Sequence, residues 1–203
     1  MTKKSKKKQT IDTYDKSAKF HADKFDDIGA RVKDIKLTFS KVKKDSPKTI
    51  ELGCGNGRDA EEIIKYTNDY LGIDLASELI KLAKKKVGNQ YFKVADIETF
   101  NYPKNIDVVF SFASLLHSDK ESVKKVLNNI CANMSKGGVV FISLKYDKYQ
   151  ERLMNREQQG LKTFYFYTPE DIKQISPKGF ISIFENIQNF KGQKWFSLIL
   201  QKK

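Results

Sequence analysis

The chain has 203 residues, of which 39% are apolar, so it is long enough for one domain with a buried core and too apolar for a disordered chain. Its formal net charge is +13, but lysine supplies nearly all of the positive charge, which argues against an arginine-rich surface that reads bases; nucleic acid stays open as a partner without being favoured. No apolar run is long enough to cross a bilayer, and no apolar run follows the basic N-terminus as it would in a secretory signal, so we expect a cytoplasmic protein without a membrane partner. The two cysteines have no metal-ligand spacing, so we expect no metal.

The N-terminal part of the chain divides into two predicted segments. Residues 1–9 are rich in lysine and poor in apolar side chains, and we expect them to form a disordered tail. Residues 10–46 are predicted to be mostly helical, with apolar side chains at helical spacing. Pro47 then interrupts the pattern, and residues 47–203 are expected to form the core of the same single domain.

From Pro47 onward, apolar runs typical of strands alternate with amphipathic stretches typical of helices. Strands are predicted at residues 49–52, 70–74, 91–94, 106–112 and 139–144, and helices at 59–66, 77–87 and 120–134. Such alternation is typical of a doubly wound α/β sheet whose strands are mostly parallel.

The last quarter of the chain has a different pattern. Residues 145–164 form a polar stretch with no evident core face, and Thr168 followed by Pro169 predicts a short helix. Strands are predicted at residues 180–187 and 195–201, joined by so short a link that they must be antiparallel. The fold class is therefore α/β, with a doubly wound seven-stranded sheet whose last strand is antiparallel and with helices on both faces.

The stretch IELGCGNGRDAEEI, residues 50–63, places three glycines between a predicted strand and a predicted helix. Glycines there let the backbone approach a ligand closely, and a helix N-terminus attracts an anionic group. The spacing excludes the dinucleotide pattern G-x-G-x-x-G, because Arg58 occupies its third glycine position, and the phosphate loop G-x-x-x-x-G-K-[ST] has no match.

Two acids end the next two predicted strands. Asp74 follows the glycine turn by about 20 residues, where a carboxylate can accept hydrogen bonds from ribose hydroxyls. Asp96 ends the following strand, where it can accept from an exocyclic adenine amine beside the backbone N–H of Ile97. Because parallel strands end at the same edge of a sheet, we expect both acids to lie near the glycine turn.

These residues resemble the class I, Rossmann-like S-adenosylmethionine-dependent methyltransferases of the small-molecule type. The resemblance is most specific over residues 51–117, where ELGCGNG, GID, ADIE and IDVVFSFASLLH follow the first four motifs of that family. It implies S-adenosyl-L-methionine as the cofactor and S-adenosyl-L-homocysteine as the product. The cofactor-binding residues implied are Tyr14, Glu51, Gly53, Cys54, Gly55, Gly57, Asp74, Leu75, Asp96, Ile97, Phe112 and Ala113.

Within that resemblance the roles divide by position. The three glycines would wrap the methionine part, and Glu51 would hold its amino group. Phe112 and Ala113 would line the floor beneath the sulfonium. Tyr14 would close over the cofactor from a lid helix, within residues 10–46.

The methyl acceptor is less well specified. The sulfonium methyl is already activated, so a general base is needed only for a protonated nucleophile, and His117 is the candidate. Residues 145–167 are expected to cover the substrate, with Arg152, Arg156 and Tyr165 beside His117 in the pocket. The leading hypothesis is methyl transfer to an O, N or S atom of a small molecule. The alternatives are an RNA or protein substrate and a non-catalytic regulatory protein that binds the cofactor; the oligomeric state is not predicted.

Overall fold

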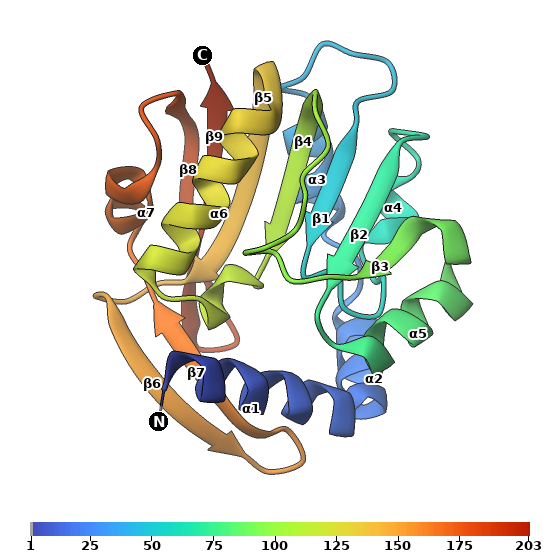
Figure 1. Cartoon of the computed structure of the whole chain (residues 1–203), viewed down its shortest axis with the longest axis vertical. Coiled ribbons are helices and arrows are strands. Elements are labelled where there is room, and N and C mark those ends of the chain that lie inside the picture. The colour runs from blue at the N-terminus through green and yellow to red at the C-terminus, as the bar shows by residue number, and fades with distance from the viewer. Residues whose placement is uncertain (1) are drawn as a thin grey trace.

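The computed structural model describes residues 2–203, except for the side chain of Arg156. Its centre is a seven-stranded sheet with the order β3-β2-β1-β4-β5-β9-β8 (Figure 1). The strands are β1 (Thr49–Leu52), β2 (Tyr70–Asp74), β3 (Phe92–Val94), β4 (Ile106–Phe112), β5 (Met134–Lys145), β8 (Phe180–Phe190) and β9 (Gln193–Lys202). The first five are parallel and β9 is antiparallel to both of its neighbours, which confirms the predicted fold class.

Helices cover both faces of this sheet. The α-helices of the described residues are α1 (Lys3–Lys16), α2 (Ala18–Ile28), α3 (Val32–Phe39), α4 (Ala60–Ile63), α5 (Ser77–Lys86), α6 (Lys120–Asn133) and α7 (Pro169–Ile175). Apolar side chains of α6 and α7 pack on one face, and those of α3, α4 and α5 pack on the other. Side chains alternate across a strand, so Val109 of β4 joins the first cluster and Phe110 the second.

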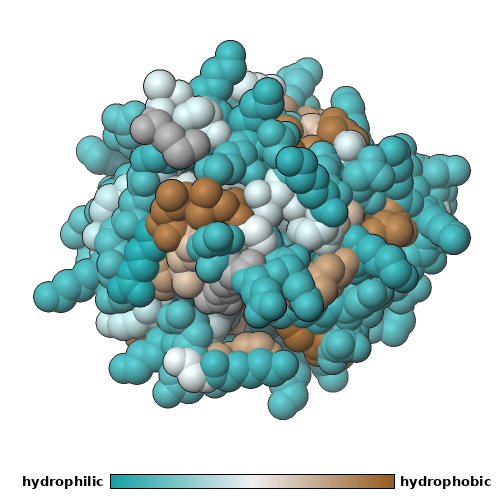
Figure 2. Space-filling view, turned by 90° about the horizontal axis from the view of Figure 1, so that it is seen from below, coloured by the Kyte–Doolittle hydropathy of each residue, from teal (hydrophilic) through white to brown (hydrophobic). Residues whose placement is uncertain are grey.

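A two-stranded hairpin and two helices lie across the edge of the sheet at which the parallel strands end (Figure 1). The hairpin consists of β6 (Gln150–Arg156) and β7 (Gly160–Phe166), and α1 packs against β7 and α5. Figure 2 looks onto this end, where hydrophilic side chains cover most of the surface and hydrophobic ones form small separate patches. The expectation that residues 145–164 lack a core face was wrong for the part of β7 that they include, because Lys162, Thr163 and Phe164 are buried.

The predicted disorder of residues 1–9 was also wrong for the part that the structure describes; Met1 lies outside it. Residues from Lys3 onward belong to α1, which begins at the N-cap residue Thr2. Lysines of this helix reach carboxylates of the core: Lys3 pairs with Asp119 at 2.8 Å, and Lys6 pairs with Glu151. Repulsion among lysines in the isolated segment is thus offset by acids distant in the sequence. Within residues 2–203, no helix has the length and apolar composition needed to span a bilayer.

Candidate active site

The glycine turn links β1 to α4 and lies against the ends of β2 and β4. Gly53, Gly55 and Gly57 all have positive φ, at 67°, 56° and 75°. A Cβ atom at Gly53 would lie 2.3 Å from Cβ of Ser114, which follows β4. The turn therefore needs glycine at Gly53 for two reasons, the left-handed backbone and the close approach of a neighbouring segment.

Asp74, at the end of β2, holds this turn through both of its carboxylate oxygens. Oδ2 accepts a hydrogen bond from the backbone N–H of Gly55 at 2.9 Å, and Oδ1 accepts from that of Ala76 at 2.9 Å. Burial raises the pKa of Asp74, while the backbone donors oppose that shift. The predicted proximity of Asp74 to the glycine turn is thus present in the structure.

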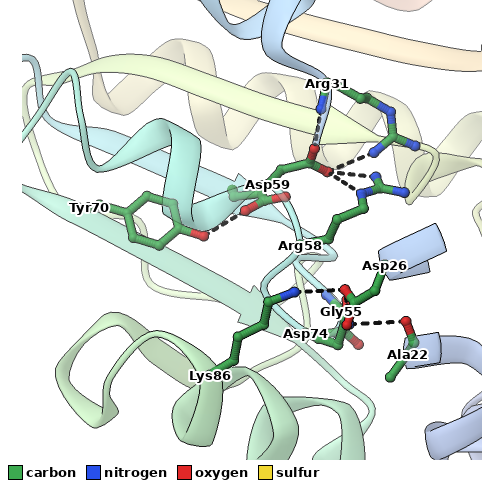
Figure 3. A network of polar contacts seen from close by, with 11 residues as sticks. Ala22, Asp26, Arg31, Gly55, Arg58, Asp59, Tyr70, Asp74 and Lys86 are labelled. Carbon is green, nitrogen blue, oxygen red and sulfur yellow. Dashed lines mark hydrogen bonds and ion pairs between the residues drawn. The ribbon is translucent and has the colours of Figure 1, made fainter. Parts of the chain in front are cut away.

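Beneath the turn lies a buried network of acids and arginines (Figure 3). Glu51 accepts a hydrogen bond from the Tyr70 hydroxyl at 2.6 Å, and burial together with the nearby Asp59 carboxylate raises the pKa of Glu51 to about 8. Asp59 accepts from Arg31 Nη1 at 2.7 Å and from Arg58 Nη2 at 2.6 Å. Glu51 is consequently protonated for the most part at pH 7, and it can bind a cationic group by giving up that proton.

Asp96 lies after β3, as predicted, but a lysine of α1 already occupies its carboxylate. Lys7 Nζ lies 2.8 and 2.7 Å from the two oxygens of Asp96 and 2.7 Å from Glu98 Oε1. Lys7 and the neighbouring Ile97 line the cavity described next, whereas Asp96 does not. The lysine-rich helix is therefore a component of the site.

A cavity of about 440 Å³ extends from the glycine turn to the hairpin side of the molecule, between the sheet edge and helices α1 and α2. Most of the residues that the sequence predicted for the cofactor contribute to its wall. They are Tyr14, Glu51, Gly53, Cys54, Gly55, Asp74, Leu75, Ile97, Phe112 and Ala113. Gly57 does not line it, because a Cβ there would point at Phe92 and Ala83 in the core.

Tyr14 and His117 meet on this wall. The Thr163 carbonyl can only accept, so His117 Nδ1 donates to it at 2.7 Å, and His117 Nε2 accepts from the Tyr14 hydroxyl at 2.9 Å. Burial lowers the pKa of His117 to about 3. The imidazole is therefore neutral across the ordinary pH range, with its acceptor nitrogen already hydrogen-bonded.

The arginine and tyrosine predicted for the substrate pocket face elsewhere. Arg152 pairs with Asp147 at 2.8 Å and lies over the ring of Phe166, and neither Arg152 nor Tyr165 lines the cavity. Tyr165 instead donates a hydrogen bond to Glu151 at 3.1 Å. The prediction of Arg152 and Tyr165 as pocket residues was wrong, because neither lines the cavity and their polar groups pair with Asp147 and Glu151 of the chain itself. The side chain of Arg156 lies outside the described residues.

Two lysines on the wall were missed by sequence reasoning. Lys145 ends β5 and is 7% exposed, and Lys162 of β7 is 2% exposed. Lys145 could have been predicted from the sequence, because it ends a buried strand in the same way that Asp74 does. Lys162 lies in the stretch read as polar and had no such signal.

Comparisons with known proteins agree with this geometry. The sequence profile of a methyltransferase domain family matches residues 50–138. Malonyl-[acyl-carrier protein] O-methyltransferase 1 from Ilyobacter polytropus is 24% identical, and the match covers 91% of this chain and 75% of that protein.

Solved structures show the same fold at low sequence identity. A TehB-like S-adenosylmethionine-dependent methyltransferase from Corynebacterium glutamicum superposes with a TM-score of 0.69 at 16% identity, covering 92% of this chain and 98% of the other. The magnesium protoporphyrin IX methyltransferase of Synechocystis PCC 6803, solved with bound S-adenosylmethionine, has a TM-score of 0.64 at 15% identity, covering 90% and 80%. At these identities the structures establish the fold of the chain.

Proposed function

Because the chain belongs to the class I, Rossmann-like S-adenosylmethionine-dependent methyltransferases, we propose that it moves the methyl group to a nucleophilic atom of a small molecule. The observation that carries this proposal is the cavity, which continues past the cofactor-binding residues toward a wall made by β5, β7, β8 and β9. A cavity of about 440 Å³ suits a small ligand beside the cofactor better than it suits an RNA or protein chain.

The family's cofactor, S-adenosylmethionine, supplies an activated methyl on a sulfonium. We assign its methionine part to the turn around Gly53 and Gly55, its amino group to Glu51, and its ribose to Asp74. Lys7 would then leave Asp96 as the adenine amine takes its place, with Ile97 against the ring. Because the sulfonium methyl is already activated, the main role of the chain would be to orient the acceptor.

Catalysis by a histidine base is disfavoured by the setting of His117. With a pKa lowered to about 3, its imidazole is a weak proton acceptor at neutral pH, and Tyr14 already occupies Nε2. We therefore assign His117 the role of holding the Tyr14 hydroxyl against the cavity. An acceptor that arrives unprotonated needs no base from the protein.

The lysines of the N-terminus are weak evidence for a polyanionic substrate, because several of them are already paired within the fold. Lys3, Lys6 and Lys7 all form ion pairs with carboxylates of the same chain. Their charge is thereby partly neutralised within the fold, which lowers their value as contacts for nucleic-acid phosphates.

The proposed function is tested with cofactor labelled in its methyl group and a cell extract separated into small-molecule, RNA and protein fractions. We expect label in the small-molecule fraction, and none when the Asp74→Asn variant replaces the wild type. Label confined to RNA or protein would overturn the proposal. Cofactor binding without transfer to any fraction would instead identify a regulatory protein.

The raised pKa of Glu51 predicts that cofactor binding releases a proton. Glu51 is mostly protonated at pH 7 in the empty protein, and a cationic amino group beside it lowers its pKa again. Wild type should therefore release up to about one more proton per cofactor bound than the Glu51→Gln variant, which has nothing to lose at this position. The difference should fall toward zero above about pH 9, where Glu51 is already ionised.

Calorimetry in buffers of different ionisation enthalpy measures this proton count directly. The comparison with Glu51→Gln cancels protons that the cofactor itself gains or loses. Equal release by the two proteins at pH 7 would show that Glu51 does not contact the charged end of the cofactor.

A further inference from the structure

Helix α1 covers one side of the cavity. Four of its residues line the cavity: Lys7, Thr10, Ile11 and Tyr14. Because residues three or four positions apart share one face of a helix, these four side chains lie on the same face of α1. The helix therefore follows the cavity for about two turns, starting at Lys7.

Polar contacts rather than apolar packing hold α1 in this place. Among the residues of α1, all of which the structure describes, only Thr10 is buried. Its hydroxyl accepts a hydrogen bond from the backbone N–H of Thr163 at 3.2 Å, and Asp15 accepts one from that of Glu78 at 2.9 Å. Each such contact contributes little net free energy, because water or a ligand can replace it. The contacts of α1 can therefore change with what the cavity holds.

The ammonium group of Lys7 separates Asp96 from the cavity. Its Nζ lies 2.8 and 2.7 Å from the two carboxylate oxygens, and Lys7 lines the cavity whereas Asp96 does not. The carboxylate is also fixed by the backbone, since its Oδ1 accepts a hydrogen bond from the N–H of Glu98 at 3.0 Å. Lys7 therefore has to leave before a ligand in the cavity can donate to Asp96.

The ion pair of Lys7 and Asp96 is one that a ligand can open. The two side chains are 30% and 28% exposed, so water partly screens their attraction. Glu98 Oε1 lies 2.7 Å from the same Nζ and remains as an acceptor once Asp96 is released. Lys7 thus has a carboxylate partner in both arrangements, and it can return to Asp96 when the ligand leaves.

Opening this pair nevertheless lowers the affinity for the ligand. The exocyclic amine of adenine is neutral, so its hydrogen bond to Asp96 lacks the charge–charge attraction that Lys7 provides. Exchanging Lys7 for the amine therefore subtracts from the affinity that the other contacts supply.

We infer that Lys7 is an internal competitor for the adenine subsite, an autoinhibitory contact that closes Asp96 in the empty protein. In the proposed function, on which this rests, Asp96 receives the adenine amine. S-Adenosylmethionine and S-adenosylhomocysteine share the adenosyl group, so Lys7 weakens the binding of both. The weaker binding of the product favours its release after methyl transfer.

Calorimetric titration with S-adenosylhomocysteine tests the competition in wild type and in the Lys7→Met variant. Methionine keeps an unbranched side chain and removes the charge. At low salt the variant should bind about fivefold more tightly, near the upper limit for an ion pair of this exposure. Equal or weaker binding by Lys7→Met would overturn the inference.

Added KCl should reduce this advantage of the variant. Between about 0.01 M and about 1 M ionic strength, the Debye length falls from about 30 to about 3 Å, which weakens the pair of Lys7 and Asp96 in wild type. The ratio of the two Kd values should therefore fall toward one. A ratio that is independent of salt would show that the charge of Lys7 is not the cause.

S-Inosylhomocysteine is the matched ligand, because a carbonyl oxygen replaces the exocyclic amine. It offers Asp96 no donor at that position, so Lys7→Met should not bind it more tightly than wild type does. A gain of the same size for both ligands would place the effect away from Asp96 and contradict the competition.

Two other lysines of α1 provide protein controls. Lys8→Met removes the same charge from an exposed residue that is not among the described residues lining the cavity. Lys3→Met breaks another ion pair of α1, with Asp119 at 2.8 Å. Both variants should bind S-adenosylhomocysteine within about twofold of wild type. A gain in either that equals the gain in Lys7→Met would assign the effect to net charge or to a loosened helix, against a role specific to Lys7.

Wild-type binding separates this inference from the proposed function. If wild type does not bind S-adenosylhomocysteine at all, the proposed function fails. If wild type binds it and Lys7→Met gains nothing, only the competition at Asp96 fails.

Discussion

Replacing Asp74 by Asn is expected to raise the Kd for S-adenosylmethionine about a hundredfold or more. Both carboxylate oxygens of Asp74 accept backbone hydrogen bonds, from Gly55 and from Ala76. An amide offers one oxygen and places its NH₂ against a backbone donor, and it also loses a charged acceptor for the ribose. Each hydrogen bond to a charged group contributes about 1.5–3 kcal/mol, so losing two of them costs about 3–6 kcal/mol, which is a hundredfold or more in affinity.

Calorimetric titration of the Asp74→Asn variant provides the measurement, and the chain supplies a matched control. Asp69 immediately precedes the same strand at its opposite end, where its side chain is 61% exposed and 3.6 Å from Lys48. Asp69→Asn should change the Kd less than about twofold, because an exposed pair contributes little. An Asp74→Asn variant that melts normally and binds cofactor within threefold of wild type would remove Asp74 from the site.

The second large effect is expected for stability, in the Gly53→Ala variant. The left-handed backbone at Gly53 costs a side-chain residue about 1–2 kcal/mol. The new Cβ would also lie 2.3 Å from Cβ of Ser114, and since that atom is attached to the backbone, the segment after β4 must shift. Overpacking of this kind adds about 1–3 kcal/mol, for a total loss of about 2–5 kcal/mol in the free energy of unfolding.

Gly137→Ala isolates the first contribution, the cost of the left-handed backbone. Gly137 has a similar φ of 79°, but a Cβ there would meet nothing within 4 Å. Urea denaturation should therefore show a loss of about 1–2 kcal/mol for Gly137→Ala and a clearly larger loss for Gly53→Ala. Equal losses for the two variants would mean that the close approach of Ser114 does not constrain the turn.

Local patterns were sufficient for the sheet and for one half of the site. Strand and helix periods are set within a few residues, and parallel strands of a doubly wound sheet share one carboxyl edge. That reasoning placed Asp74 beside the glycine turn, where both of its oxygens accept backbone hydrogen bonds, and it predicted that the last strand, β9, is antiparallel to the strand before it.

The same reasoning wrongly predicted a disordered N-terminus, because ion pairs with distant residues order that segment. A run of lysines has no core face of its own, so its own composition predicts disorder. The acids that order it, Asp96, Asp119 and Glu151, lie about 90 to 145 residues away in sequence. No local sequence pattern indicates that α1 lies beside all three of these acids.

What the sequence determined by itself is the end of the cavity that we assign to the cofactor, because the glycine turn and its acid belong to one short strand–turn–helix unit and its neighbouring strand. The tertiary structure decided the other end, which we assign to the acceptor. The sequence predicted Arg152 as a pocket residue, but in the structure Arg152 pairs with Asp147 and does not line the cavity. Lys145 and Lys162, which were not predicted, do line it. Both line it because the chain just after β7 lies beside the end of β5, where the backbone N–H of Tyr167 donates to the Lys145 carbonyl at 3.3 Å. Such a contact between distant segments depends on the packing of the whole chain.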